Sequence, residues 1–272
     1  ATSPLFQALF KSVQEAGYNL TNDVNGYRQE GFAPFDRNIK HGKRWSAACA
    51  YLYPNQDRDN LEVRTRAFTT KILFEGTKAV GVEYEWQGGT HRVFADKIVL
   101  SAGAINTPQL LEVSGVGDRE ILEKHGIDVV KHLPGVGENL QDHLEFYFQI
   151  ASKEPITLYS AQGLVAKGRI GTQWLLMKNG LGATNHFESC GFIRSRAGVA
   201  WPDIQYHFVP AMLEDHGRTK VKGHGFSCHA CVLRPESRGT VRLASAAVAG
   251  AIDTCAAASA ATSLSPSPTI RA

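Results

Sequence analysis

The chain has 272 residues, of which 43% are hydrophobic and 20% charged, and its formal net charge is +3. This is the composition of a globular protein with one large or two small domains. The basic residues are scattered along the chain, so nucleic acid is not implied as a partner, and no stretch approaches the roughly 18 apolar residues that span a bilayer. The sequence begins at Ala1 with neither a Met nor a basic and apolar leader, so we expect no targeting segment.

The N-terminal part predicts one clear helix and one short one. Residues 5–17 carry apolar side chains at helical spacing and end at Gly17. A stretch rich in Gly, Asn and Pro then continues to about residue 44, where we expect mostly loop. The run 46–54 is typical of a short helix that Pro54 stops.

Five β-rich runs separated by turn residues follow. They are residues 61–65, 68–75, 80–86, 91–95 and 97–101. Val80, Val82, Tyr84 and Trp86 alternate with polar residues and Gly81, which predicts a meander with one covered face. The last run, KIVLS, is short and apolar, as expected of a strand buried on both faces of a mixed sheet.

Two helices should come next. Thr107 is a good N-cap and Pro108 a good first helical residue, so we expect a helix from there to near Gly115. Asp118 can cap a second helix that Gly126 ends. Further along, residues 202–210 and 225–233 are predicted strands.

The strand at 143–150 has two contrasting faces. Leu144, Phe146, Phe148 and Ile150 make one uniformly apolar face, which we expect to be buried. The opposite face carries His143, Glu145, Tyr147 and Gln149. A histidine and a carboxylate side by side there need an explanation.

The cysteines are odd in number and widely spread, which does not indicate a disulfide framework and fits a reducing compartment better. They are Cys49, Cys190, Cys228, Cys231 and Cys255. Cys228 and Cys231, with His224 and His229 nearby, raise the question of zinc. In a strand, however, positions 228 and 231 point to opposite faces, and no second ligand pair at suitable spacing exists. We therefore expect no metal.

The segment 103–117, GAINTPQLLEVSGVG, resembles a signature of the glucose–methanol–choline (GMC) family of flavin oxidoreductases at nine positions. Residues 133–145, LPGVGENLQDHLE, resemble the choline dehydrogenase branch in particular, as do 22–32, 185–195 and 202–210. The resemblance runs from about residue 1 to 245. The remaining residues, 246–272, are rich in Ala, Ser, Thr and Pro, and we interpret them as a disordered or non-homologous tail.

The resemblance implies a mixed α/β (α+β) fold, with a partial Rossmann-type FAD-binding domain and a substrate domain built on an antiparallel sheet. We expect residues 1–44 to be a helical and loop-rich part of the substrate side, 45–138 the partial FAD domain, and 139–245 the substrate domain. The GxGxxG fingerprint does not occur, and nothing after Arg242 resembles the region of the family's catalytic histidine. The chain is therefore interpreted as an internal fragment.

The resemblance also assigns site residues. Glu145 would face the quaternary ammonium of choline, with Tyr147 as an aromatic wall. His143 and His207 would support catalysis by positioning the alcohol, the base itself being absent from this chain. FAD is the implied cofactor, and its adenine would lie against Thr69, Ser101, Ala102 and Gly103.

The function that follows is FAD-dependent oxidation of choline to betaine aldehyde, in glycine betaine synthesis. Two alternatives stay open: a family member acting on an uncharged alcohol, which would leave Glu145 unexplained, and a non-catalytic module that binds a quaternary ammonium. By resemblance, the other partners are a respiratory electron acceptor and a membrane contacted peripherally. The location would be the mitochondrial inner membrane for an animal-like source and the bacterial cytoplasmic membrane otherwise.

Overall fold

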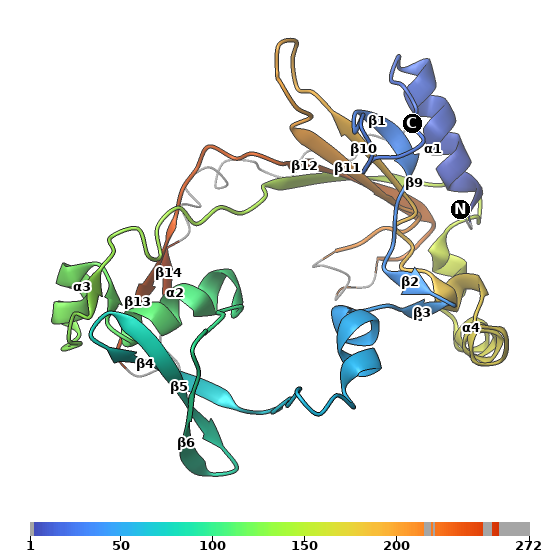
Figure 1. Ribbon diagram of the computed structural model, residues 1–272. Helices are drawn as coiled ribbons and strands as arrows, with labels where there is room; N and C mark the ends of the chain where they lie inside the picture. Colours follow the sequence, from blue (N-terminus) through green and yellow to red (C-terminus); the bar gives the residue numbers. More distant parts are fainter. Residues whose placement is uncertain (1–2, 215–218, 220, 247–251, 256–272) are drawn as a thin grey trace. The chain divides into compact units, whose positions relative to one another are not determined.

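The computed structural model describes residues 3–214, 219, 221–246 and 252–255 (Figure 1). It divides into two compact units, each built from two stretches of chain. The first, called here the sheet unit, comprises Ala1–Leu61 and His143–Pro235. The second, called the meander unit, comprises Glu62–Asp142 and Glu236–Ala272. Each unit is described by itself.

The sheet unit is built on a five-stranded antiparallel sheet in the order β1-β10-β11-β12-β9. The strands are β1 (Gly31–Pro34), β9 (Glu145–Ala151), β10 (Ser189–Ile193), β11 (Ile204–Val209) and β12 (Gly225–Val232). The last three strands in the sheet order, β11, β12 and β9, coincide with the runs predicted at 202–210, 225–233 and 143–150. They bring β9 into one hydrogen-bonded layer with β11 and β12, which lie more than fifty residues further along the sequence.

Helix α1 (Pro4–Glu15) packs on one face of this sheet (Figure 1). Ser3 caps it, because its hydroxyl oxygen accepts a hydrogen bond from the Leu5 amide. Phe6 of the helix is fully buried and meets Phe208 of β11 edge to face at 5.8 Å. The predicted helix at 5–17 is thus confirmed, and it covers β11 and β12.

The face of β9 that we expected to be buried is exposed. Leu144, Phe146, Phe148 and Ile150 expose 56%, 61%, 42% and 47% of their surface. The reason is position: β9 is at the edge of the sheet, whereas the apolar cluster of α1 lies over Phe208 and Cys228 of the neighbouring strands. Alternation along a strand fixes which side chains share a face, but not what covers that face.

Several short elements complete the sheet unit. The strands β2 (Ile39–Lys40) and β3 (Lys43–Arg44) form a hairpin. The short helix expected at 46–54 is present as a π-helical turn, Ala48–Leu52, followed by a 3-10 turn, Tyr53–Asn55. Helix α4 (Leu164–Met177) lies between 3-10 turns at Leu158–Ala161 and Gly180–Ala183.

The meander unit contains the three-stranded antiparallel sheet β4 (Phe68–Glu75), β5 (Lys78–Trp86) and β6 (Gly89–Phe94). Helix α2 (Gly103–Val113) packs against it through a core of Ile72, Leu110, Val113 and Leu243. Strands β7 (Val116–Gly117) and β8 (Lys131–His132) pair in parallel around α3 (Arg119–Lys124), which Asp118 caps as predicted. Strand β13 (Thr240–Leu243) pairs with β14 (Ile252–Cys255).

Two predicted strands are absent from the meander unit and from the segment leading into it. Residues 61–65 and 97–101 are extended or turn segments without ladder partners among the described residues. A strand needs a neighbour to accept its backbone hydrogen bonds, and an apolar run without one is left open, as shown by Val99, which exposes 85% of its surface. Burial of 97–101 on both faces is therefore wrong for this structure.

The start of α2 also differs from expectation. The helix begins at Gly103 and contains Pro108, which we expected to be the first helical residue. The first four amides of a helix have no intrahelical partner in any case. Pro108 is the sixth residue of the helix, so its missing amide removes one intrahelical hydrogen bond. The turn before it is nevertheless helical.

The boundaries between the two compact units fall at residues 61, 142 and 235. The division into functional domains at 44, 138 and 245 stays a prediction. Residues 236–245 belong to the meander unit because β13 packs on α2, where Leu243 joins the core. The tail at 246–272 lies outside the described residues, except for Ala246 and the strand β14. Among the described residues, no helix is long and apolar enough to cross a membrane.

Candidate functional site

The candidate site is built on one row of the five-stranded sheet. Tyr147 of β9 lies directly opposite His229 of β12, which in turn lies opposite His207 of β11. Directly opposed residues of antiparallel strands project from the same face. The sheet register therefore sets three aromatic and imidazole side chains in a line, on the face that is opposite to the Phe146 side of β9.

These side chains line a cavity of about 640 Å³. Its wall also includes residues from the loops at 35–36, 185–187 and 213. The lining residues are Phe35, Asp36, Glu145, Tyr147, Asn185, Phe187, His207, Leu213 and His229. Apart from Glu145, His207, His229 and Asp36, the side chains of the cavity wall are aromatic, aliphatic or amide.

Glu145 is held by His229. The Nδ1–H of His229 donates a hydrogen bond to the Oε1 of Glu145, and the imidazole stacks on Tyr147 with ring centroids 5.2 Å apart. The His229 side chain is only 13% exposed, while that of Glu145 is 41% exposed. The histidine thus fixes one carboxylate oxygen from beneath and leaves the carboxylate open to the cavity.

His207 is enclosed by aromatic rings. Phe35 stacks on it at 5.5 Å, and Phe187 meets it edge-on at 6.4 Å. Burial lowers the pKa of His207 below its usual value; His229 and His143 lower it further, and Glu145 acts against them. His207 is therefore a neutral imidazole at pH 7, able to donate or accept a hydrogen bond without adding positive charge.

The cavity combines a carboxylate with aromatic faces. Glu145 provides the negative charge, and Tyr147, Phe35 and Phe187 provide rings. A cation that carries methyl groups instead of N–H groups is bound by charge and by ring faces, not by hydrogen bonds. The chemistry of this cavity suits a small organic cation.

Of the four side chains that the resemblance assigned to the substrate site, three come together in this cavity: Glu145, Tyr147 and His207. His143 does not line the cavity, because β9 begins only at Glu145 and the preceding residues leave the sheet. His143 still lies close enough for its charge to lower the pKa of His207.

Sequence reasoning missed the role of His229, and it missed Phe35 and Phe187. His229 was considered only as a zinc ligand. The available signal was the strand pattern GFSCHACV, which places His229 and Cys231 on one face, but the partner strand is not readable from that pattern. Among the described residues, no group of three or more His, Cys, Asp or Glu could hold a metal ion.

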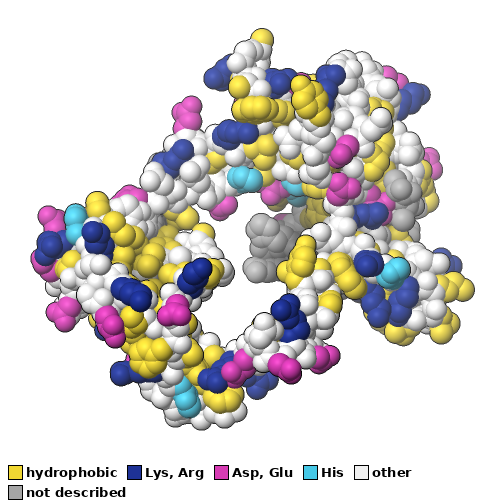
Figure 2. Space-filling view, in the orientation of Figure 1, with side chains coloured by type: hydrophobic (Ala, Val, Ile, Leu, Met, Phe, Trp, Pro, Cys, Tyr) yellow, Lys and Arg dark blue, Asp and Glu magenta, His cyan; other side chains and the backbone are white. Residues whose placement is uncertain are grey.

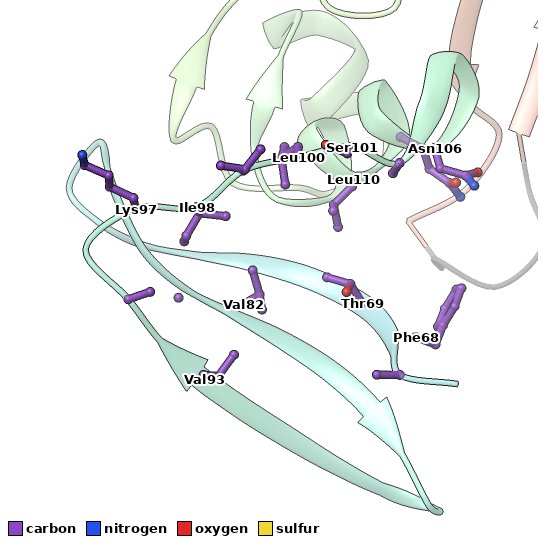
Figure 3. A pocket seen from close by; sticks show the side chains of 16 residues that line it. Phe68, Thr69, Val82, Val93, Lys97, Ile98, Leu100, Ser101, Asn106 and Leu110 are labelled. Carbon is purple, nitrogen blue, oxygen red and sulfur yellow. The ribbon is translucent and has the colours of Figure 1, made fainter. Parts of the chain in front are cut away.

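The meander unit has a second, larger cavity of about 1220 Å³ (Figure 3). It lies between the meander and the segment 97–102 with α2. Figure 3 shows Ile98 and Leu110 facing Val82 of β5 across it. Its wall is largely apolar and includes three of the residues assigned to FAD, which are Thr69, Ser101 and Ala102.

The fourth assigned residue, Gly103, is the first residue of α2 and does not line this cavity. Its φ is +86°, a conformation that favours glycine, and no atom lies within 4 Å of where a Cβ would stand. Ala102 and Gly103 are both exposed, so the backbone here is open to a flat ligand. That these four residues contact FAD stays a prediction.

The two cavities and the two-unit α/β fold define a protein that pairs an aromatic, carboxylate-bearing pocket with a separate apolar cleft. A family model described as GMC oxidoreductase matches residues 1–145, more than half of the chain. The chain belongs to the GMC oxidoreductase family.

The chain is highly similar to curated relatives, but it matches only part of their length. The chain is 52% identical over 245 residues to "Oxygen-dependent choline dehydrogenase" of Photobacterium profundum, covering 90% of this chain and 43% of the relative. It is 52% identical over 244 residues to "Choline dehydrogenase, mitochondrial" of Homo sapiens, covering 89% and 41%. The chain thus spans less than half the length of these relatives.

Solved structures agree on the fold. Pyridoxine 4-oxidase from Mesorbium loti superposes with a TM-score of 0.78 at 26% identity, over 94% of this chain and 47% of that one. A formate oxidase superposes with a TM-score of 0.84 at 21% identity, over 93% and 48%, which supports the fold alone. The mixed α/β fold expected from the sequence is confirmed.

Proposed function

We propose that this chain supplies the substrate pocket of an FAD-dependent enzyme that oxidises choline to betaine aldehyde. The observation that carries the proposal is the Glu145 carboxylate, held by His229 in a cavity with aromatic walls. The choline dehydrogenases at 52% identity support the same substrate. Betaine aldehyde is the precursor of glycine betaine, which places the reaction in glycine betaine synthesis.

Glu145 recognises the cationic end of choline. A trimethylammonium group has no N–H to donate, so charge and ring faces are what a protein offers it. The attraction between a carboxylate and a cation is stronger in a partly desolvated pocket than in water. Tyr147 and Phe187 exclude water from that contact and contribute their ring faces.

His207 orients the alcohol end. Its pKa is lowered mainly by burial, so it is neutral and does not repel the cation that Glu145 attracts. A neutral imidazole can hydrogen-bond the choline hydroxyl and hold the carbinol carbon in place. His143 lies outside the cavity, and its charge lowers the pKa of His207. No described residue is assigned the part of the catalytic base.

The meander unit fits one end of FAD. Thr69, Ser101 and Ala102 border an apolar cavity that can take a flat adenine, and the exposed backbone at Gly103 leaves room beside it. The phosphates are assigned to no residue of this chain, since GxGxxG does not occur in it. Bound FAD would supply the acceptor for the hydride that leaves the alcohol carbon.

The electron acceptor and the location are parts of the same proposal. We infer a respiratory acceptor and peripheral contact with a membrane: the mitochondrial inner membrane in an animal-like source, the cytoplasmic membrane in a bacterial one. One relative is named mitochondrial and another is a bacterial protein, so the relatives support a mitochondrial or a bacterial setting, and neither name mentions a membrane.

Calorimetry with choline and its uncharged isostere 3,3-dimethylbutan-1-ol tests the pocket directly. We expect the chain to bind choline at least tenfold more tightly than 3,3-dimethylbutan-1-ol. Glu145→Gln should remove that preference, which is a loss on the order of 1–2 kcal/mol in the free energy of choline binding. Glu154→Gln, an exposed carboxylate in the same unit, is the matched control and should change nothing.

Equal binding of the two ligands by the unaltered chain would favour the uncharged-alcohol alternative. Choline binding by the full-length product of the gene, without choline-dependent reduction of a dye, would favour the non-catalytic one. Either result would overturn the proposed reaction.

A further inference from the structure

Helix α4 (Leu164–Met177) presents a group of large apolar side chains outward. Leu164, Val165, Leu175 and Leu176 expose 88%, 88%, 63% and 77% of their surface, and no residue of the helix is buried. The helix is attached through its other side, where Ile170 and Trp174 lie against Gly182. At 100° per residue, the four exposed residues fall on one face.

The stretch of chain that carries this face is basic and contains no carboxylate. Residues 155–187, which include α4, contain no Asp or Glu, while Lys167, Arg169 and Lys178 lie within or next to the helix. A second stretch, residues 37–56, also lacks Asp and Glu. Apolar residues with a purely basic rim are unusual in a chain with 26 carboxylates.

The fold brings the two acid-free stretches together. Trp174 of α4 donates a hydrogen bond from its Nε1 to the carbonyl oxygen of Gly42, in the turn of the β2–β3 hairpin, at 2.7 Å. The ammonium of Lys178 lies 4.1 Å from the centre of the Trp174 ring. The hairpin adds three exposed basic residues beside the helix, which are Lys40, Lys43 and Arg44.

Figure 2 shows Lys and Arg side chains gathered beside hydrophobic ones over α4 and the hairpin, at the lower right. The six basic residues are Lys40, Lys43, Arg44, Lys167, Arg169 and Lys178. In the part of the chain that the structure describes, none of them forms an ion pair with a carboxylate. Their charge is therefore available to an external partner.

We propose that α4 and the β2–β3 hairpin form the surface by which the protein lies on an anionic lipid bilayer. A helix with an apolar face, a basic rim and no acidic residue inserts that face at the boundary of headgroups and acyl chains, while its Lys and Arg contact lipid phosphates. Charge complementarity selects this partner, because the surface has six cations and no carboxylate of its own.

This inference deepens the membrane contact proposed above by assigning it to named residues, and it rests on that contact alone. It does not depend on choline or on FAD. A second copy of the chain fits the surface less well, since two such faces would bring twelve like charges together.

The experiment uses the full-length product of the gene and flotation with phosphatidylcholine vesicles, with or without cardiolipin. We expect binding to the cardiolipin vesicles that high salt weakens. Leu164→Ser with Leu176→Ser should lower the partition coefficient at least tenfold. Lys167→Gln with Arg169→Gln should lower it by about 25-fold, at about fivefold per basic residue. Tyr27→Ser and Arg28→Gln, exposed residues of another loop in the same unit, are the matched controls.

A second measurement separates lipid from protein coverage. Leu164→Cys should react with a maleimide without vesicles and be protected by cardiolipin vesicles. A cysteine that is unreactive without vesicles, or one whose reactivity follows a monomer–dimer equilibrium, would mean that protein covers this face, and the inference would be wrong.

No vesicle binding by the unaltered protein would overturn the membrane contact itself. Binding that all variants keep would overturn only the assignment to α4 and the hairpin. Neither result bears on the choline pocket, which calorimetry tests separately.

Discussion

His229 and Glu145 act as one unit in the pocket, because the only described group that fixes the Glu145 carboxylate is the His229 imidazole. We expect His229→Phe, which keeps a ring over Tyr147 but removes the donor, to weaken choline binding by about 3- to 10-fold. In a protein that already carries Glu145→Gln, adding His229→Phe should weaken choline binding almost no further. Such non-additivity is what a double-mutant cycle measures for residues in contact.

The control for this cycle is His224→Phe. His224 is paired with Thr157, away from the cavity, and its replacement should leave the choline dissociation constant as it is. If the effects of His229→Phe and Glu145→Gln add fully, the histidine does not work through the carboxylate.

His207 makes the stability of the sheet unit depend on pH. Burial lowers its folded-state pKa, so the unfolded chain takes up a proton at a higher pH than the folded one. Below about pH 6.5 the unfolded state binds more protons, and stability falls as the pH falls from there. We expect the urea midpoint to drop from pH 7.5 to 5.5, and to drop less in His207→Gln.

A smaller pH dependence of stability should remain in His207→Gln, since burial also lowers the pKa of His186. The charged groups that act on His207 from neighbouring strands, Glu145 and His229, are intact in that variant. An unchanged slope between pH 7.5 and 5.5 in His207→Gln would show that the imidazole is not held neutral by the fold.

At the scale of elements, the turn at 133–138 contains two glycines with different demands. Gly137 has a φ of +75°, and a Cβ on it would collide with the backbone carbonyl of Val241 in β13. Gly135 has ordinary φ and open space around it. We expect Gly137→Ala to destabilise the meander unit by about 2–4 kcal/mol and Gly135→Ala to stay within about 0.5 kcal/mol.

Urea unfolding of the two alanine variants measures this difference. The pair is informative because both substitutions add one methyl group to the same turn. Equal effects would mean that the turn is not pressed against β13 as described.

How much of the fold could be predicted depends on whether the signal is local. The strands β5 and β11, the Asp118 cap and the Gly126 stop are set by residues next to one another, and they were predicted correctly. The run 97–101 was wrong because a strand is completed by a neighbour that its own residues do not specify.

The site follows the same rule. Glu145 and Tyr147 share a face of one strand, and that could be seen in the sequence. His229 comes from a different strand, 84 positions away from Glu145, and only the register of β12 against β9 brings them together. The resemblance supplied His207 by motif, whereas no motif pointed to His229.

At the scale of the whole molecule, the chain passes from the sheet unit to the meander unit and back, and then enters the meander unit again. The apolar clusters keep to this division. The cluster of Ile72, Leu110, Val113 and Leu243 belongs to the meander unit, while those around Phe6, Cys190 and Phe10 belong to the sheet unit. Units with separate cores can open separately.

Native-state hydrogen exchange of Gly137→Ala tests this separation. The substitution should speed exchange of the amides in β4 and β5 by roughly 30-fold or more, as a loss of about 2 kcal/mol requires, because their unit has lost stability. Amides in β11 and β12 should keep the rates of the unaltered chain, since their protection comes from the α1 side of the other core. Equal acceleration in all four strands would mean that the two units unfold as one, and that the pocket around Glu145 depends on the meander unit for its stability.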